Sequence, residues 1–237
     1  MRQLIIILCL LCSQFCRAQS FTFPKLVAQG TTIDKLTPTN WKLIDSASGD
    51  LNNDKTDDLV LVLEFDKPVT EKRAYGDNET ELIKEFQKPR ILAIYFRDTK
   101  TGKLSFALQN NNFMLRANEG GALGEPFKKI NIANNCLNIS FEGGNDWRWK
   151  LNYQFKYQTK DWHLIFANNT YYNATTGEMV DKAYNFNTRR LIETKGNLFT
   201  RSNANQTTEE ILYFSQLRTF NSFRKPWTWE ITKDNFL

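Results

Sequence analysis

A segment rich in aspartate and asparagine, residues 49–58, carries the sharpest chemical pattern in the sequence. If Asp50 is counted as position 1, oxygen-bearing side chains stand at positions 1, 3, 5 and 9 of this loop: Asp50, Asn52, Asp54 and Asp58. The carbonyl of Thr56 at position 7 can add a further ligand, which is how calcium loops gather six to eight oxygens. The spacing therefore predicts that a metal bound here would be Ca²⁺ rather than a softer ion.

Position 6 of this loop is unusual, because Lys55 stands where calcium loops carry a glycine. A side chain in the left-handed region costs about 1 kcal/mol, and an ammonium group close to the ion repels it. An EF-hand is not expected, since position 12 is Leu61 rather than glutamate. Two interpretations stay open: a weak calcium site, or an Asx-rich turn that satisfies its own backbone without a metal.

A second set of polar residues has the composition of a ligand cleft. It contains Arg116, Glu119, Glu125 and Arg148, together with the glycine pairs 120–121 and 143–144. Glycine permits close backbone approach, and arginine binds carboxylate or sugar hydroxyl groups in a fork. The alternative is that the glycines serve turns and bulges while the charges form surface pairs worth about 0–1 kcal/mol.

Other chemistry has little support in the sequence. Cys136 and His163 are the only cysteine–histidine pair beyond residue 18, and both lie in strand-like surroundings. No nucleophile elbow, phosphate loop or zinc-protease helix is present. The net charge of +5 is mild and argues against nucleic acid as a partner. Trp227 and Trp229, beside a proline, are the aromatic residues that we expect to be exposed.

Residues 1–18 are typical of a secretory signal peptide. Arg2 provides the positive end, residues 4–11 the apolar stretch, and Ala18 a cleavage site before Gln19. The apolar stretch is shorter than the about 20 residues that a membrane helix needs, and no later segment approaches that length. We therefore expect an exported protein, periplasmic or secreted, with no membrane span. Cys136 alone remains after cleavage, so no internal disulfide is predicted.

The rest of the chain is predicted to be mostly β, an antiparallel meander or sandwich-like sheet with one or two short helices. Every second residue from Trp147 to Tyr157 is apolar, which indicates one long half-buried strand that continues through a turn into residues 162–166. Residues 59–63 are all aliphatic, which favours a strand covered on both faces. Shorter candidate strands follow the same logic: 41–44, 90–97, 104–109, 130–132 and 137–141.

Two segments predict helices instead. Residues 79–86 lie in a charged stretch, and residues 207–217 begin with a capping box, although their apolar content also suits a strand. The predicted organisation is a signal peptide (1–18), an N-terminal lead (19–36), a β domain (37–200) and a C-terminal extension (201–237), forming a monomer.

The order of these blocks resembles a family of exported bacterial proteins with an aspartate-rich loop like that of VCBS and FG-GAP repeats. The resemblance rests on residues 41–44, 50–63, 90–92, 109–111, 115–121, 124–127, 143–144, 147–149, 153–155, 161–165 and 184–186. This chain departs from the family at Lys55, at Glu125 where aspartate is expected, and at Phe166 where glycine is favoured. The resemblance implies export and a β fold, and no assigned activity.

We interpret the sequence as an exported binding module of unknown ligand, with weak calcium binding at residues 50–58 as an accompanying hypothesis. An enzyme acting on envelope polysaccharide or peptide, built on Glu119, Glu125 and Arg148, is the first alternative. A structural or protein-interaction factor of the cell envelope is the second.

Overall fold

The computed structural model describes residues 21–74, 82–200, 205–233 and 235–237. The predicted signal peptide lies outside the described residues. The chain is mostly β with antiparallel sheets, as the sequence predicts. No helix in the described parts of the chain is long and apolar enough to span a membrane.

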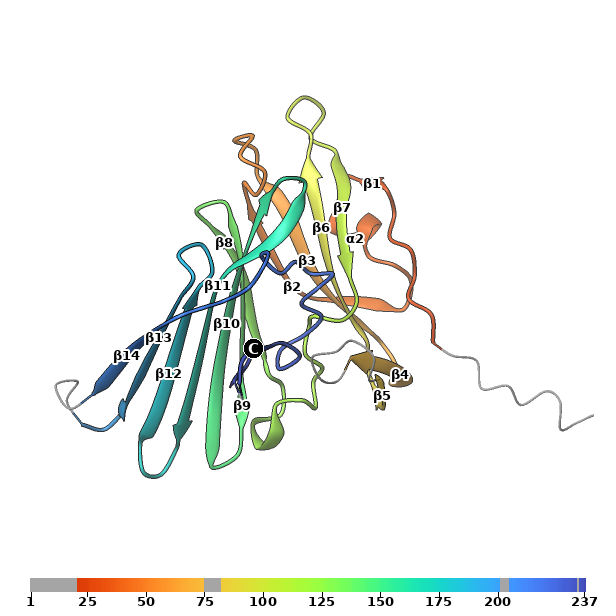
Figure 1. Cartoon of the computed structure of the whole chain (residues 1–237). Helices are drawn as coiled ribbons and strands as arrows, with labels where there is room; N and C mark the ends of the chain where they lie inside the picture. The colour runs from red at the N-terminus through yellow and green to blue at the C-terminus, as the bar shows by residue number, and fades with distance from the viewer. Residues whose placement is uncertain (1–20, 75–81, 201–204, 234) are drawn as a thin grey trace, which may run out of the picture.

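One half of the molecule is a five-stranded antiparallel sheet (Figure 1). Its strand order is β1 (Gln29–Gly30), β7 (Leu104–Asn110), β6 (Arg90–Arg97), β3 (Asp58–Phe65) and β2 (Trp41–Gly49). The central strand β3 is covered on both faces, which confirms the prediction from its aliphatic run. Val60 and Val62 join a large core shared with the second sheet, whereas Leu59, Leu61 and Leu63 join a smaller core. The N-terminal segment closes that smaller core with Leu26 and Leu36.

The other half is a seven-stranded meander in which each strand pairs with the next along the chain. Its strands are β8 (Phe127–Ala133), β9 (Cys136–Gly144), β10 (Trp147–Gln158), β11 (Asp161–Asn173), β12 (Glu178–Asn185), β13 (Arg190–Asn197) and β14 (Gln206–Ile211). Figure 1 shows this sheet fanning away from the five-stranded sheet. The two sheets meet where β8 lies against β2, and the Asp45 carboxylate accepts the Ile130 N–H there at 3.0 Å.

The long alternating strand is confirmed as β10. Its side chains Leu151, Tyr153 and Phe155 are buried, and Trp149 packs against the same core. A two-residue turn then returns the chain as β11, with Thr159 and Lys160 both at positive φ (51° and 64°), as expected for a tight hairpin. We call the face of this sheet that carries these buried residues the inner face, and the opposite one the outer face.

The smaller elements are the hairpins β4 (Val69–Ala74) with β5 (Leu82–Gln87) and β15 (Glu230–Thr232) with β16 (Asn235–Phe236), the helical turn α2 (Ile33–Leu36) and the 3₁₀ turn η1 (Gly121–Leu123). The helix predicted over residues 79–86 is wrong from Leu82 onward, because that part pairs with β4; residues 79–81 lie outside the described residues. The helix predicted over residues 207–217 is also wrong, because residues 206–211 pair with β13.

The C-terminal segment lies against the inner face of the large sheet. Phe220, Phe223 and Leu237 are buried in the shared core, and the Phe220 ring stacks on Phe155 with the centroids 3.8 Å apart. The expected exposure of Trp227 and Trp229 is wrong. Trp229 is buried, and Trp227 is half-buried with its ring edge-to-face against Trp149, because this segment completes the core instead of leaving it.

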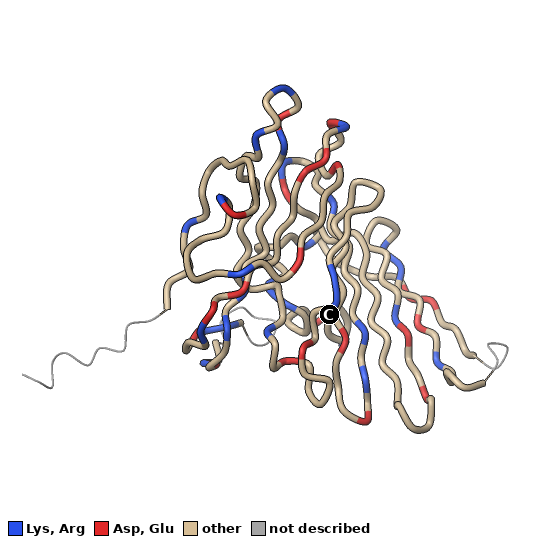
Figure 2. Tube along the Cα trace, turned by 180° about the vertical axis from the view of Figure 1, so that it is seen from behind, with Lys and Arg blue, Asp and Glu red and all other residues tan. Residues whose placement is uncertain are grey.

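Charged residues are distributed over both halves. Figure 2 shows lysine and arginine interspersed with aspartate and glutamate on both sheets. The surface charge is therefore mixed in sign over the described chain.

Candidate functional site

The aspartate-rich loop connects β2 to β3, and its first carboxylate is occupied by the loop's own backbone. One oxygen of Asp50 accepts the N–H groups of Asn53 and Asp54 at 2.7 and 3.2 Å. The other oxygen accepts the Lys55 N–H at 2.9 Å. Lys55 has the positive φ, 68°, that the spacing predicts for position 6.

The remaining loop oxygens are used in the same way. The Asn52 side chain accepts the Asp54 N–H at 3.0 Å, and the Asp54 carboxylate accepts the Thr56 N–H at 2.8 Å. Asp58 is fully buried, and its two oxygens accept the N–H groups of Leu51 and Arg97, each at 2.9 Å. Burial raises the pKa of Asp58, although the two backbone donors oppose that rise.

The loop as folded is an Asx-rich turn. Among the described residues, no group of three or more histidine, cysteine or acidic side chains is arranged to hold a metal. In this turn the side-chain oxygens satisfy the backbone N–H groups of the loop, which needs no ion to hold its shape. Calcium binding stays a prediction.

Arg116, the first residue of the predicted cleft, is fully buried. It donates two hydrogen bonds to Glu71, at 2.8 and 3.0 Å, and one to the Met114 carbonyl at 2.6 Å. Burial, together with the nearby charge of Arg73, lowers the pKa of Arg116 to about 10. This bidentate pair is the geometry that arginine adopts with a carboxylate, and here the carboxylate belongs to the protein.

Glu119 lies beside this pair and is held by two cations. Arg73 donates to one carboxylate oxygen, and the Lys225 ammonium lies 3.1 Å from the other. Burial opposes the charge on Glu119, but the attraction of Arg73 and Lys225 outweighs it and holds the pKa at about 2. Glu119 is therefore ionised at neutral pH and remains paired with both cations.

Glu125 belongs to a neighbouring ion cluster around Arg90. This buried arginine donates to Glu64 at 2.6 Å, to Glu125 at 2.8 Å and to the Leu115 carbonyl at 2.7 Å. Burial opposes the charge of Arg90, yet the two carboxylates raise its pKa. The three buried arginines, Arg73, Arg90 and Arg116, all donate to carbonyls between residues 111 and 115, and so they hold that segment in place.

Arg148 lies apart from the other predicted cleft residues. It stands on β10 opposite Gly144 on one side and Tyr172 on the other, and no ion pair joins it to an acid among the described residues. The glycine pairs do meet, since the Gly144 N–H donates to the Gly120 carbonyl at 2.9 Å. A Cβ at Gly120 would lie 2.0 Å from the Gly124 carbonyl oxygen, so the backbone itself fills this region.

Cys136 and His163 do not form a pair. They lie on β9 and β11, each opposite Lys156 of the intervening strand β10, so two strand spacings, about 10 Å, separate their backbones. Cys136 is buried, which raises the pKa of its thiol, as expected of a small core residue.

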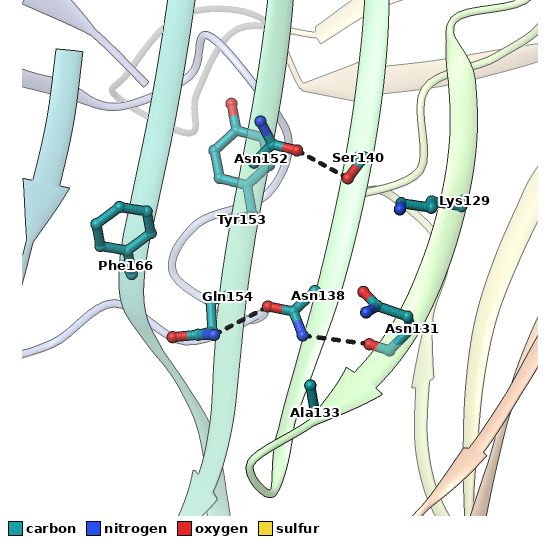
Figure 3. A pocket seen from close by; sticks show the side chains of 9 residues that line it. All are labelled: Lys129, Asn131, Ala133, Asn138, Ser140, Asn152, Tyr153, Gln154 and Phe166. Carbon is teal, nitrogen blue, oxygen red and sulfur yellow. Dashed lines mark hydrogen bonds between the residues drawn. The ribbon is translucent and has the colours of Figure 1, made fainter.

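A groove on the outer face of the seven-stranded sheet has the free hydrogen-bonding groups that the other two candidates lack. We call it the outer groove; its volume is about 380 Å³. Figure 3 shows its lining from four adjacent strands, β8 to β11: Lys129, Asn131, Ala133, Asn138, Ser140, Asn152, Tyr153, Gln154 and Phe166. Tyr153 contributes at the floor, since its side chain is buried in the core.

The amides of the groove form a partly bonded ladder across the strands. Gln154 donates to the Asn138 oxygen at 2.9 Å, and the Asn138 nitrogen donates to the Asn131 and Cys136 carbonyls at 3.4 and 3.3 Å. Ser140 donates to the Asn152 oxygen at 2.8 Å. These bonds hold the side chains in fixed orientations across the sheet (Figure 3).

Several polar groups in the groove have no hydrogen-bond partner in the described chain. Within the described chain, no hydrogen bond is made by the Gln154 oxygen, the Asn152 nitrogen, the Asn131 side chain or the Lys129 ammonium. They stand on an exposed face, where a ligand can reach them. In the sequence, the groove is signalled only by the polar half of the alternation in each strand.

A second hollow at the end of β7 is less open to a ligand. Its two amides on β7 already bind the protein: Asn110 accepts the N–H groups of Asn112 and Phe113, and Gln109 donates to the Pro24 carbonyl. We therefore take the outer groove as the candidate functional site.

Comparison with known proteins adds no assignment. A scan against protein-family models and searches of the curated proteins and the solved structures each return no match.

Proposed function

We propose that the protein is an exported binding module that takes its ligand in the outer groove. The observation that carries this proposal is the set of unused donors and acceptors on a rigid surface, above all the Gln154 oxygen and the Asn152 nitrogen. A pre-oriented side chain loses little entropy when a ligand binds, which favours binding at such a surface. Export rests on the signal-peptide pattern of residues 1–18.

The enzyme alternative has weaker support from the geometry. Glu119 and Glu125, the carboxylates on which it was built, are each held by a buried arginine. A general acid needs a carboxyl pKa near the working pH, whereas the pKa of Glu119 is about 2. These acids therefore suit a structural role.

Side-chain amide NMR of the exported protein tests the proposal directly. We would titrate ¹⁵N-labelled protein with four defined probes: a neutral hexasaccharide, an acidic hexasaccharide, a neutral hexapeptide and inorganic phosphate. At least one probe is expected to shift the NH₂ signals of Asn138, Asn152 and Gln154, and Gln154→Ala should weaken that binding. Gln206→Ala is the matched control, because Gln206 is an exposed amide on β14, three strands beyond β11. If all four probes leave the groove signals unchanged, the proposal is rejected.

The edge strand β14 favours a protein-interaction factor as a second candidate. All six of its residues are exposed, and Tyr213 just beyond it is 83% exposed. An open edge offers main-chain groups for strand addition by a partner. A photo-crosslinking residue at Tyr213 in living cells should then give one discrete adduct, with Trp147 as the exposed control position at the start of β10. Equal labelling at both positions, or none, would argue against this role.

A further inference from the structure

We infer that the outer groove takes a neutral, hydroxyl-rich chain, an oligosaccharide. This inference rests on the proposed binding function and specifies its ligand. It is drawn from four properties of the groove: its charge, the hydrogen-bonding character of its side chains, the extended row that these side chains form, and the position of one aromatic ring.

The charge of the lining excludes a strongly ionic ligand. Lys129 is its only charged residue, and no carboxylate lines it. On the same face, Lys150 and Glu142 beyond Asn152 form an ion pair at 3.8 Å, so these two charges largely cancel, whereas the exposed Lys156 beyond Gln154 adds one positive charge. An anion such as phosphate is bound in proteins by several donors of positive charge, and a cationic ligand would need acids. One lysine in the lining and one beyond it do not make the cluster of cations that an anion needs, so the neutral amides of the groove suit an uncharged partner.

The hydrogen-bonding groups match hydroxyls. Asn131, Asn138, Asn152 and Gln154 are amides, each with both a donor nitrogen and an acceptor oxygen. A sugar hydroxyl also donates and accepts, so neighbouring hydroxyls can bind the two ends of one amide. The free Gln154 oxygen and the free Asn152 nitrogen provide one acceptor and one donor at positions two residues apart, on the same face of β10.

The ladder is extended, which suits a chain rather than a small molecule. Gln154 pairs in register with Asn138, and Asn138 with Asn131, so three amides cross three strands in one row. Adjacent strands are about 4.8 Å apart, on the scale of one sugar ring. A ligand lying across the strands therefore meets one amide per strand.

Phe166 extends the same row on β11. It pairs in register with Gln154, its side chain is half-buried on the outer face, and it lies outside the core cluster. Figure 3 shows its ring beside Gln154, at one end of the amide row. The electron-rich face of an aromatic ring packs well against the C–H groups of a sugar ring. An apolar platform next to neutral amides is the combination that a sugar requires.

Isothermal titration of the exported protein tests this ligand class. The probes are the hexasaccharides of cellulose, amylose, mannan and chitin, with oligogalacturonate as the acidic arm and a Ser/Asn-rich hexapeptide as the peptide arm. We expect at least one neutral hexasaccharide to bind. Phe166→Leu keeps apolar volume but removes the ring, and it should weaken this binding at least tenfold; Gln154→Ala should do the same.

Two control variants separate a lost contact from a damaged fold. Gln206→Ala removes an exposed amide and Ile192→Ala an exposed apolar side chain, both on the same sheet outside the groove, and each should change binding less than twofold. Thermal melts of all four variants should show one native transition. Binding of a neutral hexasaccharide that neither Phe166→Leu nor Gln154→Ala weakens would overturn the inference.

The remaining outcomes distinguish this inference from the proposed function. If only the acidic saccharide or the peptide binds, and Gln154→Ala weakens it, the groove is a binding site and the neutral-sugar inference is wrong. If no probe binds, both the inference and the proposed function are wrong.

Discussion

Replacing Glu119 by glutamine removes one negative charge from the buried ion cluster while keeping the shape of the side chain. Glu119 forms ion pairs with both Arg73 and Lys225, whose side chains are only 1% and 10% exposed. Water cannot replace the missing carboxylate at such sites, so the two cations are left buried with a weaker partner. Breaking one side of a buried ion pair typically costs about 3–5 kcal/mol.

The pKa of Glu119 provides an independent magnitude and a sign. Its folded value is about 2, against the ordinary 4.5, which corresponds to about 3 kcal/mol of stability. Because the folded pKa is the lower one, this stability is present above pH 4.5 and is lost as the pH falls towards 2. About 2 kcal/mol of it should be lost by pH 3. Glutamine does not titrate, so the Glu119→Gln protein does not lose this stability at low pH. The difference in the free energy of unfolding between the two proteins should therefore shrink by about 2 kcal/mol between pH 7 and pH 3.

Urea denaturation at pH 7, 5, 4 and 3 measures this difference. The expected result is a loss of about 3 kcal/mol for Glu119→Gln at pH 7, narrowing to about 1 kcal/mol at pH 3. Glu209→Gln is the control, because Glu209 and its partner Arg190 are each about half exposed and such pairs contribute about 0–1 kcal/mol. A Glu119→Gln protein whose deficit is under about 1 kcal/mol at pH 7, or constant with pH, would refute the reasoning.

Three further predictions follow from the packing, the loop and the leader. Phe155→Ala should cost about 3–5 kcal/mol in denaturant melts, because the ring is fully buried and stacks on Phe220; a loss below about 1 kcal/mol would contradict this burial. Calorimetry with Ca²⁺ should detect at most weak binding, with a dissociation constant of about 10⁻⁴–10⁻³ M; Lys55→Gly should tighten this binding and Asp54→Ala should abolish it. If neither the wild type nor Lys55→Gly gives heat at several millimolar Ca²⁺, the loop is only an Asx-rich turn. Intact-mass analysis of the exported protein should give a chain beginning at Gln19 without lipid, and an acylated N-terminal cysteine would disprove that.

Local patterns in the sequence were enough to predict much of the large core. The alternation from Trp147 to Tyr157 places every second side chain on one face, whatever the strand pairs with. The aliphatic run at residues 59–63 likewise predicts cover on both faces, and the two cores on either side of β3 confirm it.

Local patterns failed where pairing partners decided the structure. Residues 207–211 have the capping box of a helix, but β13 offers a free edge, and Thr194 and Glu193 pair with Thr207 and Thr208. Hydrogen bonds and cross-strand contacts with that edge outweigh the weak local preference for a helix. Trp229 was misjudged for the same reason, because no local signal shows that the C-terminal segment returns to the core.

The sequence by itself determined the β class, the long half-buried strand and the residue types available for a site. For the aspartate-rich loop it allowed two interpretations, one of which was a turn that binds its own backbone. Only the tertiary structure decided which of these residues meet. Arg116 and Glu71 are paired although 45 residues separate them in the chain, and Arg148 is left apart from the acids that it was predicted to join. The outer groove exists because the register of four successive strands brings Asn131, Asn138, Gln154 and Phe166 into one row. A shift of one residue in any of these pairings would turn its side chain to the other face, so the site depends on register, which local sequence patterns do not specify.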